Sequence, residues 1–145
     1  MKSRSILLLS VLSALVLLGF QVLSPSSAFT LTAVVDIKPE TLNVNMNGRW
    51  ITVFLSLSED YNVSDIDPST ILLENMFKAE WTSIENGVMI LKFDALGLTD
   101  YLLLKLYHMG AARTQITLVI QGELKSGGHF IGSDTITVMN PSQKT

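Results

Sequence analysis

The chain has 145 residues, 10 basic and 13 acidic side chains, a net charge of −3 and no cysteine. It lacks the clustered Lys and Arg that a nucleic acid or an anionic membrane surface requires, so neither is an expected partner. Without disulfides, the stability of a small domain has to come from its core, from a partner chain or from a bound ion.

Residues 1–28 have the layout of a secretory signal peptide. Lys2 and Arg4 give a positive start, residues 6–20 are almost entirely apolar, and small residues precede a cleavage position after Ala28. Cleavage would leave 8 basic and 13 acidic side chains, a net charge of −5. The alternative is an uncleaved membrane anchor, since an apolar run of this length is at the short end of what a bilayer requires. We therefore expect a secreted, extracellular protein, free or attached to the cell surface.

Period-two alternation of apolar and polar residues predicts a mainly β domain over residues 29–139, followed by a flexible tail at 140–145. In the clearest strand, 50–57, every second residue from Ile51 to Leu57 is aliphatic. Further strands are predicted at residues 31–37, 71–74, 78–84, 88–93, 115–124 and 130–139.

Turn residues separate these predicted strands. Asn86-Gly87 is typical of a hairpin turn, because both residues readily take positive φ, and residues 125–128 contain two further glycines. Short strands with turn signals every 8 to 12 residues or so are typical of a two-sheet sandwich. The expected fold is an immunoglobulin-like, antiparallel β-sandwich.

Residues 94–108 interrupt the strand pattern. The segment is rich in leucine and has Thr99 as its only β-branched residue, while Asp94 and Gly110 suit the two ends of a helix. We expect a short helix that crosses one end of the sandwich. A strand over residues 101–107 is the alternative.

Several runs carry a resemblance to a known module. They are VDIKPETLN at residues 35–43, SDIDPSTI at 64–71, KFD at 92–94, GEL at 122–124 and GSDTITV at 132–138. Together they resemble an immunoglobulin-like β-sandwich module of secreted archaeal and bacterial proteins. The resemblance implies an extracellular domain with no assigned catalysis, often one of several along a surface protein. Some relatives carry a calcium loop, but residues 94–100 lack its alternating oxygen ligands.

An acidic cluster supplies the candidate metal ligands. Asp60, Asp65 and Asp67, with Asn62, have the oxygen atoms that calcium prefers. The alternative is turn chemistry, because Asp and Asn side chains accept hydrogen bonds from nearby backbone N–H groups. Asn62-Val63-Ser64 is also a sequon for N-glycosylation.

No catalytic or cofactor motif is present. The two histidines, His108 and His129, are far apart and have no cysteine beside them, which argues against a zinc site. No Gly-x-Ser-x-Gly elbow occurs. We expect no cofactor and no enzyme activity.

Three aromatic residues leave a binding face open as a hypothesis. Trp50, Phe54 and Trp81 lie on predicted strands and could line a carbohydrate-binding surface. Burial in the core is the alternative, and the commoner fate of aromatic residues in a small sandwich.

The start of the exported chain suggests a second mode of association. Phe29, Leu31, Ala33 and Val35 alternate in a β-prone segment that could add to the open sheet edge of a neighbouring subunit. The alternative is that this segment is the first strand of its own sheet.

The sequence therefore predicts a secreted or cell-surface structural or interaction module without catalysis. Its expected partners are other cell-surface proteins or further copies of itself, and a membrane only if the N-terminal segment is retained. The two alternative functions are a subunit of an extracellular filament assembled by strand exchange and a carbohydrate-binding domain.

Overall fold

The structure is a computed structural model that describes residues 29–45, 48–58 and 60–143. The predicted signal peptide and the last two residues of the predicted tail lie outside the described residues.

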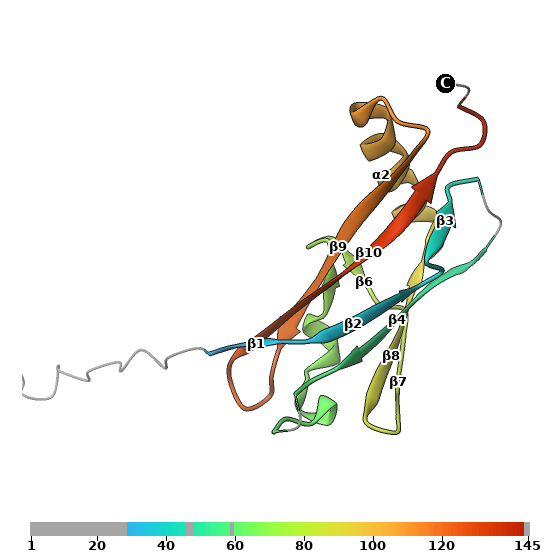
Figure 1. Cartoon of the computed structure of the whole chain (residues 1–145). Helices are drawn as coiled ribbons and strands as arrows, with labels where there is room; N and C mark the ends of the chain where they lie inside the picture. Colours follow the sequence, from blue (N-terminus) through green and yellow to red (C-terminus); the bar gives the residue numbers. More distant parts are fainter. Residues whose placement is uncertain (1–28, 46–47, 59, 144–145) are drawn as a thin grey trace, which may run out of the picture.

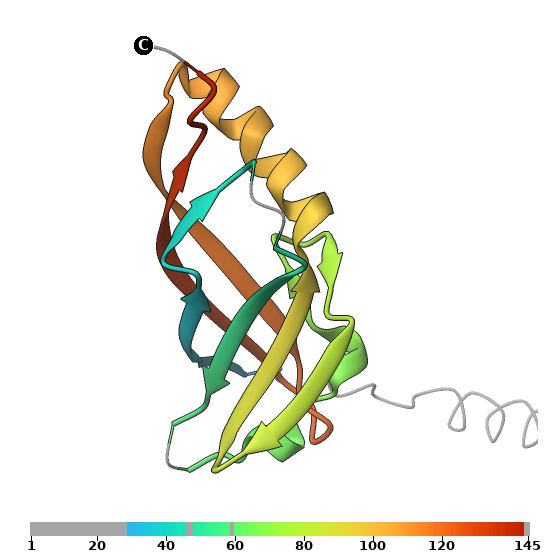
Figure 2. The same ribbon diagram turned by 90° about the vertical axis from the view of Figure 1, so that its right-hand side faces the viewer.

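Two β-sheets pack face to face, which confirms the predicted sandwich (Figures 1 and 2). The six-stranded sheet has the order β1-β10-β9-β5-β6, with β3 also paired to β10, and the four-stranded sheet has the order β2-β4-β8-β7. The strands of the six-stranded sheet are β1 (Thr30–Thr32), β3 (Thr41–Asn43), β5 (Leu72–Leu73), β6 (Phe77–Lys78), β9 (Arg113–Glu123) and β10 (His129–Met139). Those of the four-stranded sheet are β2 (Val34–Lys38), β4 (Trp50–Ser56), β7 (Trp81–Glu85) and β8 (Val88–Asp94).

The antiparallel pattern has two exceptions, because β1 and β3 both run parallel to β10. The single strand predicted at 31–37 is in fact two strands that belong to different sheets, separated at Ala33. The amide of Ala33 donates a hydrogen bond to the carbonyl of Ile131 at 2.9 Å. A side chain at Gly132 would place its Cβ 2.8 Å from the Ala33 carbonyl oxygen. The missing side chain thus lets the chain cross closely from one sheet to the other.

The predicted strand at 78–84 is likewise divided, between β6 and β7 in different sheets. The turn at Asn86-Gly87 joins β7 to β8 as predicted, with φ values of 51° and 78°. The strand β3 was not predicted, because it has only three residues and one of them, Leu42, is apolar and buried.

The core lies between the sheets and contains the faces that alternation predicted. Ile51, Val53 and Leu55 of β4 are fully buried. They face the alternating side chains of β9, of which Leu118 and Ile120 are also fully buried.

The helix α2 (Ala95–Met109) confirms the predicted helix, and the alternative strand at 101–107 is wrong. Gly110 ends it in the left-handed conformation, with φ of 62°. Asp94 occupies the N-cap position, but its side chain makes no capping hydrogen bond. The helix lies at one end of the sandwich (Figure 2). Its Leu98, Leu102 and Leu106 are fully buried and belong to the core.

The carboxylate of Glu74 fastens α2 to the six-stranded sheet. It accepts hydrogen bonds from the Tyr101 hydroxyl at 2.7 Å, the Lys105 ammonium at 3.0 Å and the Val119 amide at 2.8 Å. Burial alone would raise the pKa of Glu74, but these three donors outweigh it and hold the pKa below its usual value. The sequence gives no local sign of this contact, because its members are up to 45 residues apart.

Candidate functional site

Trp50, Phe54 and Trp81 lie on the outer face of the four-stranded sheet. Their neighbours along the strand β4 point into the core, so Trp50 and Phe54 must point outward. On β7, Trp81 pairs with Lys92 of β8, which alternates with the fully buried Phe93 and so faces outward too. The expectation that these aromatics belong to the core is therefore wrong. Both faces of β4 carry apolar residues, but among the described residues only the face of Ile51, Val53 and Leu55 packs against the other sheet.

We call this outer surface the aromatic face, and define it by Trp50, Phe54, Trp81, Ile90 and Lys92. The register makes it continuous, because Phe54 pairs with Ile90 and Trp81 with Lys92. Trp81 is 45% exposed, and the other four side chains are partly covered, as expected for the second face of β4. Within the part of the chain that the structure describes, no helix or strand lies over this face (Figure 2).

Cations lie beside both tryptophans. The ammonium of Lys92 is 5.0 Å from the centre of the Trp81 ring, and the guanidinium carbon of Arg49 is 4.7 Å from that of Trp50. These are cation–π distances, at which a cation stabilises the ring beside it by about 0.5–1 kcal/mol at an exposed site. The sequence reasoning missed Lys92, although the Asn86-Gly87 turn fixes the register that places it opposite Trp81.

Charged side chains form the border of the aromatic face on β2. Lys38 makes ion pairs with Asp36 at 3.0 Å and with Glu40 at 2.6 Å. Hydrogen bonds to Glu40 and then Asp36 raise the pKa of Lys38. Apolar rings with a rim of charges are typical of surfaces that bind proteins, and exposed aromatic rings also stack on sugars.

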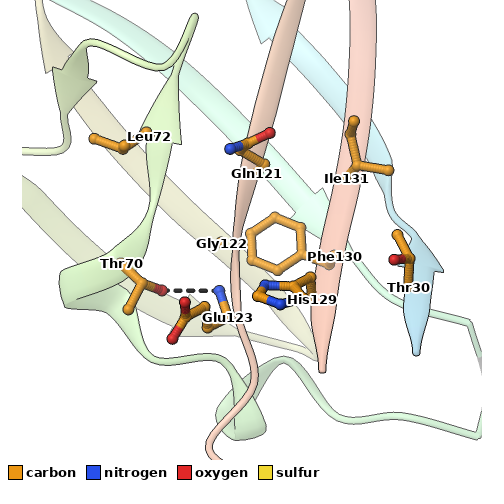
Figure 3. Close-up of a pocket in the computed structure, with 9 residues that line it drawn as sticks. All are labelled: Thr30, Thr70, Leu72, Gln121, Gly122, Glu123, His129, Phe130 and Ile131. Atoms are coloured by element: carbon orange, nitrogen blue, oxygen red, sulfur yellow. Dashed lines mark hydrogen bonds between the residues drawn. The ribbon is translucent and has the colours of Figure 1, made fainter. Parts of the chain in front are cut away.

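A shallow hollow lies on the outer side of the six-stranded sheet (Figure 3). Thr70 anchors its floor, since its hydroxyl donates to the Asp67 carbonyl and accepts from the Glu123 amide at 2.9 Å. His129 of β10 lies opposite Glu123 of β9. Among the described residues, the His129 ring makes no ion pair and no hydrogen bond to a hydroxyl group. The lining of the hollow is more apolar than polar, and it lacks the hydrogen-bonded nucleophile and base that covalent catalysis uses. Its lining residues are Thr30, Thr70, Leu72, Gln121, Gly122, Glu123, His129, Phe130 and Ile131.

Three of the four predicted calcium ligands belong to two short turns, and Asp60 precedes them. Asn62 accepts a hydrogen bond from the Ser64 amide at 2.9 Å and caps the turn η1 (Val63–Asp65). Asp67 accepts from the hydroxyl and amide of Ser69 and caps η2 (Pro68–Thr70), and these bonds lower the pKa of Asp67. Asp60 and Asp65 are exposed. In the described ranges, no three His, Cys, Asp or Glu residues gather where one metal ion could reach them.

The predicted glycosylation site is accessible. Asn62 is exposed at the start of η1, as a modified asparagine has to be. Its modification stays a prediction.

The predicted donor segment pairs within its own chain. Thr30–Thr32 aligns with His129–Ile131 of β10, and Ala33 is only 5% exposed. Leu31 and Val35 pack against the core, while the Phe29 ring lies 5.9 Å from that of Tyr61. This is the own-sheet arrangement, and donation of the segment to a neighbouring subunit stays a prediction.

No helix in the described part of the chain is long and apolar enough to cross a membrane. Comparisons with protein-family models, with curated proteins and with solved structures gave no match.

Proposed function

We propose that this protein is an exported, non-catalytic β-sandwich that binds a protein partner at the cell surface through its aromatic face. The support for export is the positive, apolar and small-residue pattern of residues 1–28. The observation that carries the binding proposal is the outward position of Trp50, Phe54 and Trp81.

Burial of apolar surface drives folding, so a small domain without disulfides has reason to keep its largest rings inside. This chain instead leaves both of its tryptophans outside the core. Aromatic residues are enriched in protein interfaces, where they contribute most of the binding energy. An open sheet face with aromatic rings and a charged rim suits a protein partner better than a small ligand, which usually binds in a concave pocket.

The test is binding of the labelled, purified domain to cell envelopes of the source organism. Trp81→Ala removes the most exposed ring of the aromatic face and should weaken binding about tenfold or more, as loss of a tryptophan at the centre of an interface does. Thr117→Ala is the matched control, because Thr117 lies on the outer side of the other sheet. Equal binding of both variants would contradict the proposal.

A carbohydrate is the second candidate ligand, favoured by the 45% exposure of Trp81. A sugar ring can stack on such a ring, and neighbouring Lys92 can donate hydrogen bonds to hydroxyl groups. Treatment of the envelopes separates the two candidates. Loss of binding after protease treatment supports a protein partner, whereas loss after periodate, which cleaves sugar diols, supports a glycan.

A further inference from the structure

We propose that two copies of this chain associate through their β7 strands, which pair antiparallel about a two-fold axis at Ser83 and join the four-stranded sheets into one. This inference does not depend on the proposed function of the aromatic face.

The strand β7 is an open edge of the four-stranded sheet (Figures 1 and 2). The two-residue turn at Asn86-Gly87 makes Glu85 and Val88 a hydrogen-bonded pair, so Ser83 also bonds toward β8. The backbone groups of Thr82 and Ile84 therefore point away from the sheet. No backbone hydrogen bond from another described element reaches them.

This edge has none of the features that usually prevent edge pairing. Proteins protect open edges with proline, with central charges or with bulges in mid-strand. Residues 82–84 are Thr-Ser-Ile, without charge or proline, and Ile84 is 46% exposed. A second strand laid against β7 would cover Ile84 and supply the missing hydrogen bonds.

The hydroxyl of Ser83 identifies the place of the axis. It is shielded from solvent and has no hydrogen-bond partner among the described residues. A buried hydroxyl without a partner is costly, and most such groups in proteins are satisfied. In an antiparallel β7 pair centred on Ser83, the two Ser83 side chains lie directly opposite each other, and a change of their rotamer would let the two hydroxyls bond each other.

The same register suits every other pair of residues. Thr82 of each copy lies opposite Ile84 of the other, and these two pairs exchange the backbone hydrogen bonds that point outward. Trp81 lies opposite Glu85, so no carboxylate meets a like charge at the pairing positions. A second copy is thus a better fit to β7 than a strand of unrelated sequence, because the edge is complementary to itself.

The outward side of α2 is the rival surface for self-association. Leu96, Leu104 and Tyr107 are 69%, 59% and 74% exposed. No feature of that side of α2 fixes how two copies would align, and no buried polar group there lacks a partner among the described residues. Dimerisation through α2 is therefore the alternative that the experiment has to distinguish from pairing through β7.

Disulfide trapping tests the register directly, because the chain contains no cysteine. Residues 29–143 contain both sheets and the whole core, so the protein is used without residues 1–28. In the proposed pair, the two Ser83 Cα atoms would be about 4.5 Å apart, within the range for a disulfide. Ser83→Cys should therefore form a covalent dimer under mild oxidation.

Glu85→Cys is the matched control, because its two copies would be separated by four residue steps, about 14 Å. It should cross-link at least tenfold more slowly than Ser83→Cys. Equal rates for the two variants, or no dimer of Ser83→Cys, would overturn the proposal.

A second set of variants tests dimerisation without a covalent bond. The monomer–dimer equilibrium is measured by sedimentation over a dilution series from millimolar to micromolar protein. Thr82→Pro removes only an outward N–H and should leave a folded monomer, with its fold checked by circular dichroism. Leu104→Lys should dimerise like the unmodified chain. A monomeric unmodified chain, or a dimer lost in Leu104→Lys but kept in Thr82→Pro, would contradict pairing through β7.

Discussion

Replacement of Glu74 should destabilise the domain strongly, although it changes only one charged side chain. Its carboxylate is 10% exposed and joins three elements, since Tyr101 and Lys105 belong to α2 and Val119 to β9. Glu74→Ala removes the acceptor from all three donors at once. The Val119 amide would then lose the partner that extends the pairing of β5 with β9.

The size of the effect follows from the three contacts. A hydrogen bond to a charged group contributes about 1.5–3 kcal/mol, which applies to the Tyr101 and Val119 donors. The Lys105 contribution is taken as about 0.5 kcal/mol, because its side chain is 34% exposed and solvent screens the pair. Glu74→Ala should therefore cost about 3.5–6.5 kcal/mol, and Glu74→Gln, which keeps one acceptor oxygen, about 2 kcal/mol.

Urea unfolding followed by circular dichroism measures these free energies. Tyr101→Phe is the control for a single contact and should cost about 1.5–3 kcal/mol, the contribution of its one hydrogen bond to the carboxylate. In a double-mutant cycle, Tyr101→Phe should cost almost nothing more once Glu74 is alanine. A loss below about 1 kcal/mol for Glu74→Ala, or full additivity with Tyr101→Phe, would refute this account of how α2 is held.

Three further predictions concern the crossing, acid sensitivity and the core. Gly132→Ala should lower the free energy of unfolding in urea by about 1–3 kcal/mol, because the new Cβ would collide with the backbone at Ala33. An unchanged urea midpoint would show that the two chain segments can move apart at this crossing. Folding lowers the pKa of Glu74, so its stabilisation is complete above a pH of about 4.3 and is lost as the pH falls through the lower folded value. In thermal unfolding measured from neutral to acidic pH, the stability of Glu74→Gln should fall less than that of the unmodified chain. An identical fall in both proteins would contradict a pKa of Glu74 that is lowered by folding. Leu118→Ala should cost about 2–5 kcal/mol, and a cost near zero would mean that the two sheets do not meet at Leu118.

Local sequence patterns predicted the longer strands, the hairpin turns and the helix, but missed β3 and merged β1 with β2 and β6 with β7. The alternation in 50–57 and 115–124 was sufficient, because one face of each strand is continuous in aliphatic residues. Asn86-Gly87 fixed a turn, and Gly110 fixed the end of α2. These features depend on neighbours a few residues apart, which a sequence displays directly.

Features that depend on distant contacts were not predicted. The break at Ala33 has no proline or glycine to mark it, and its cause is Gly132, almost 100 residues further along the chain. The degree of burial of Trp50 and Phe54 was also misjudged. Alternation placed them correctly on the face of β4 opposite Ile51, but their size suggested that this second face is covered as well.

The central claim is that the aromatic face contacts the partner, and hydroxyl-radical footprinting with mass spectrometry tests it most directly. The labelled side chains are compared between the free domain and the domain bound to envelopes. The account predicts that binding protects Trp81 and Phe54, while Tyr107 on α2 keeps its labelling. Unchanged labelling of Trp81 in the bound domain would contradict the claim.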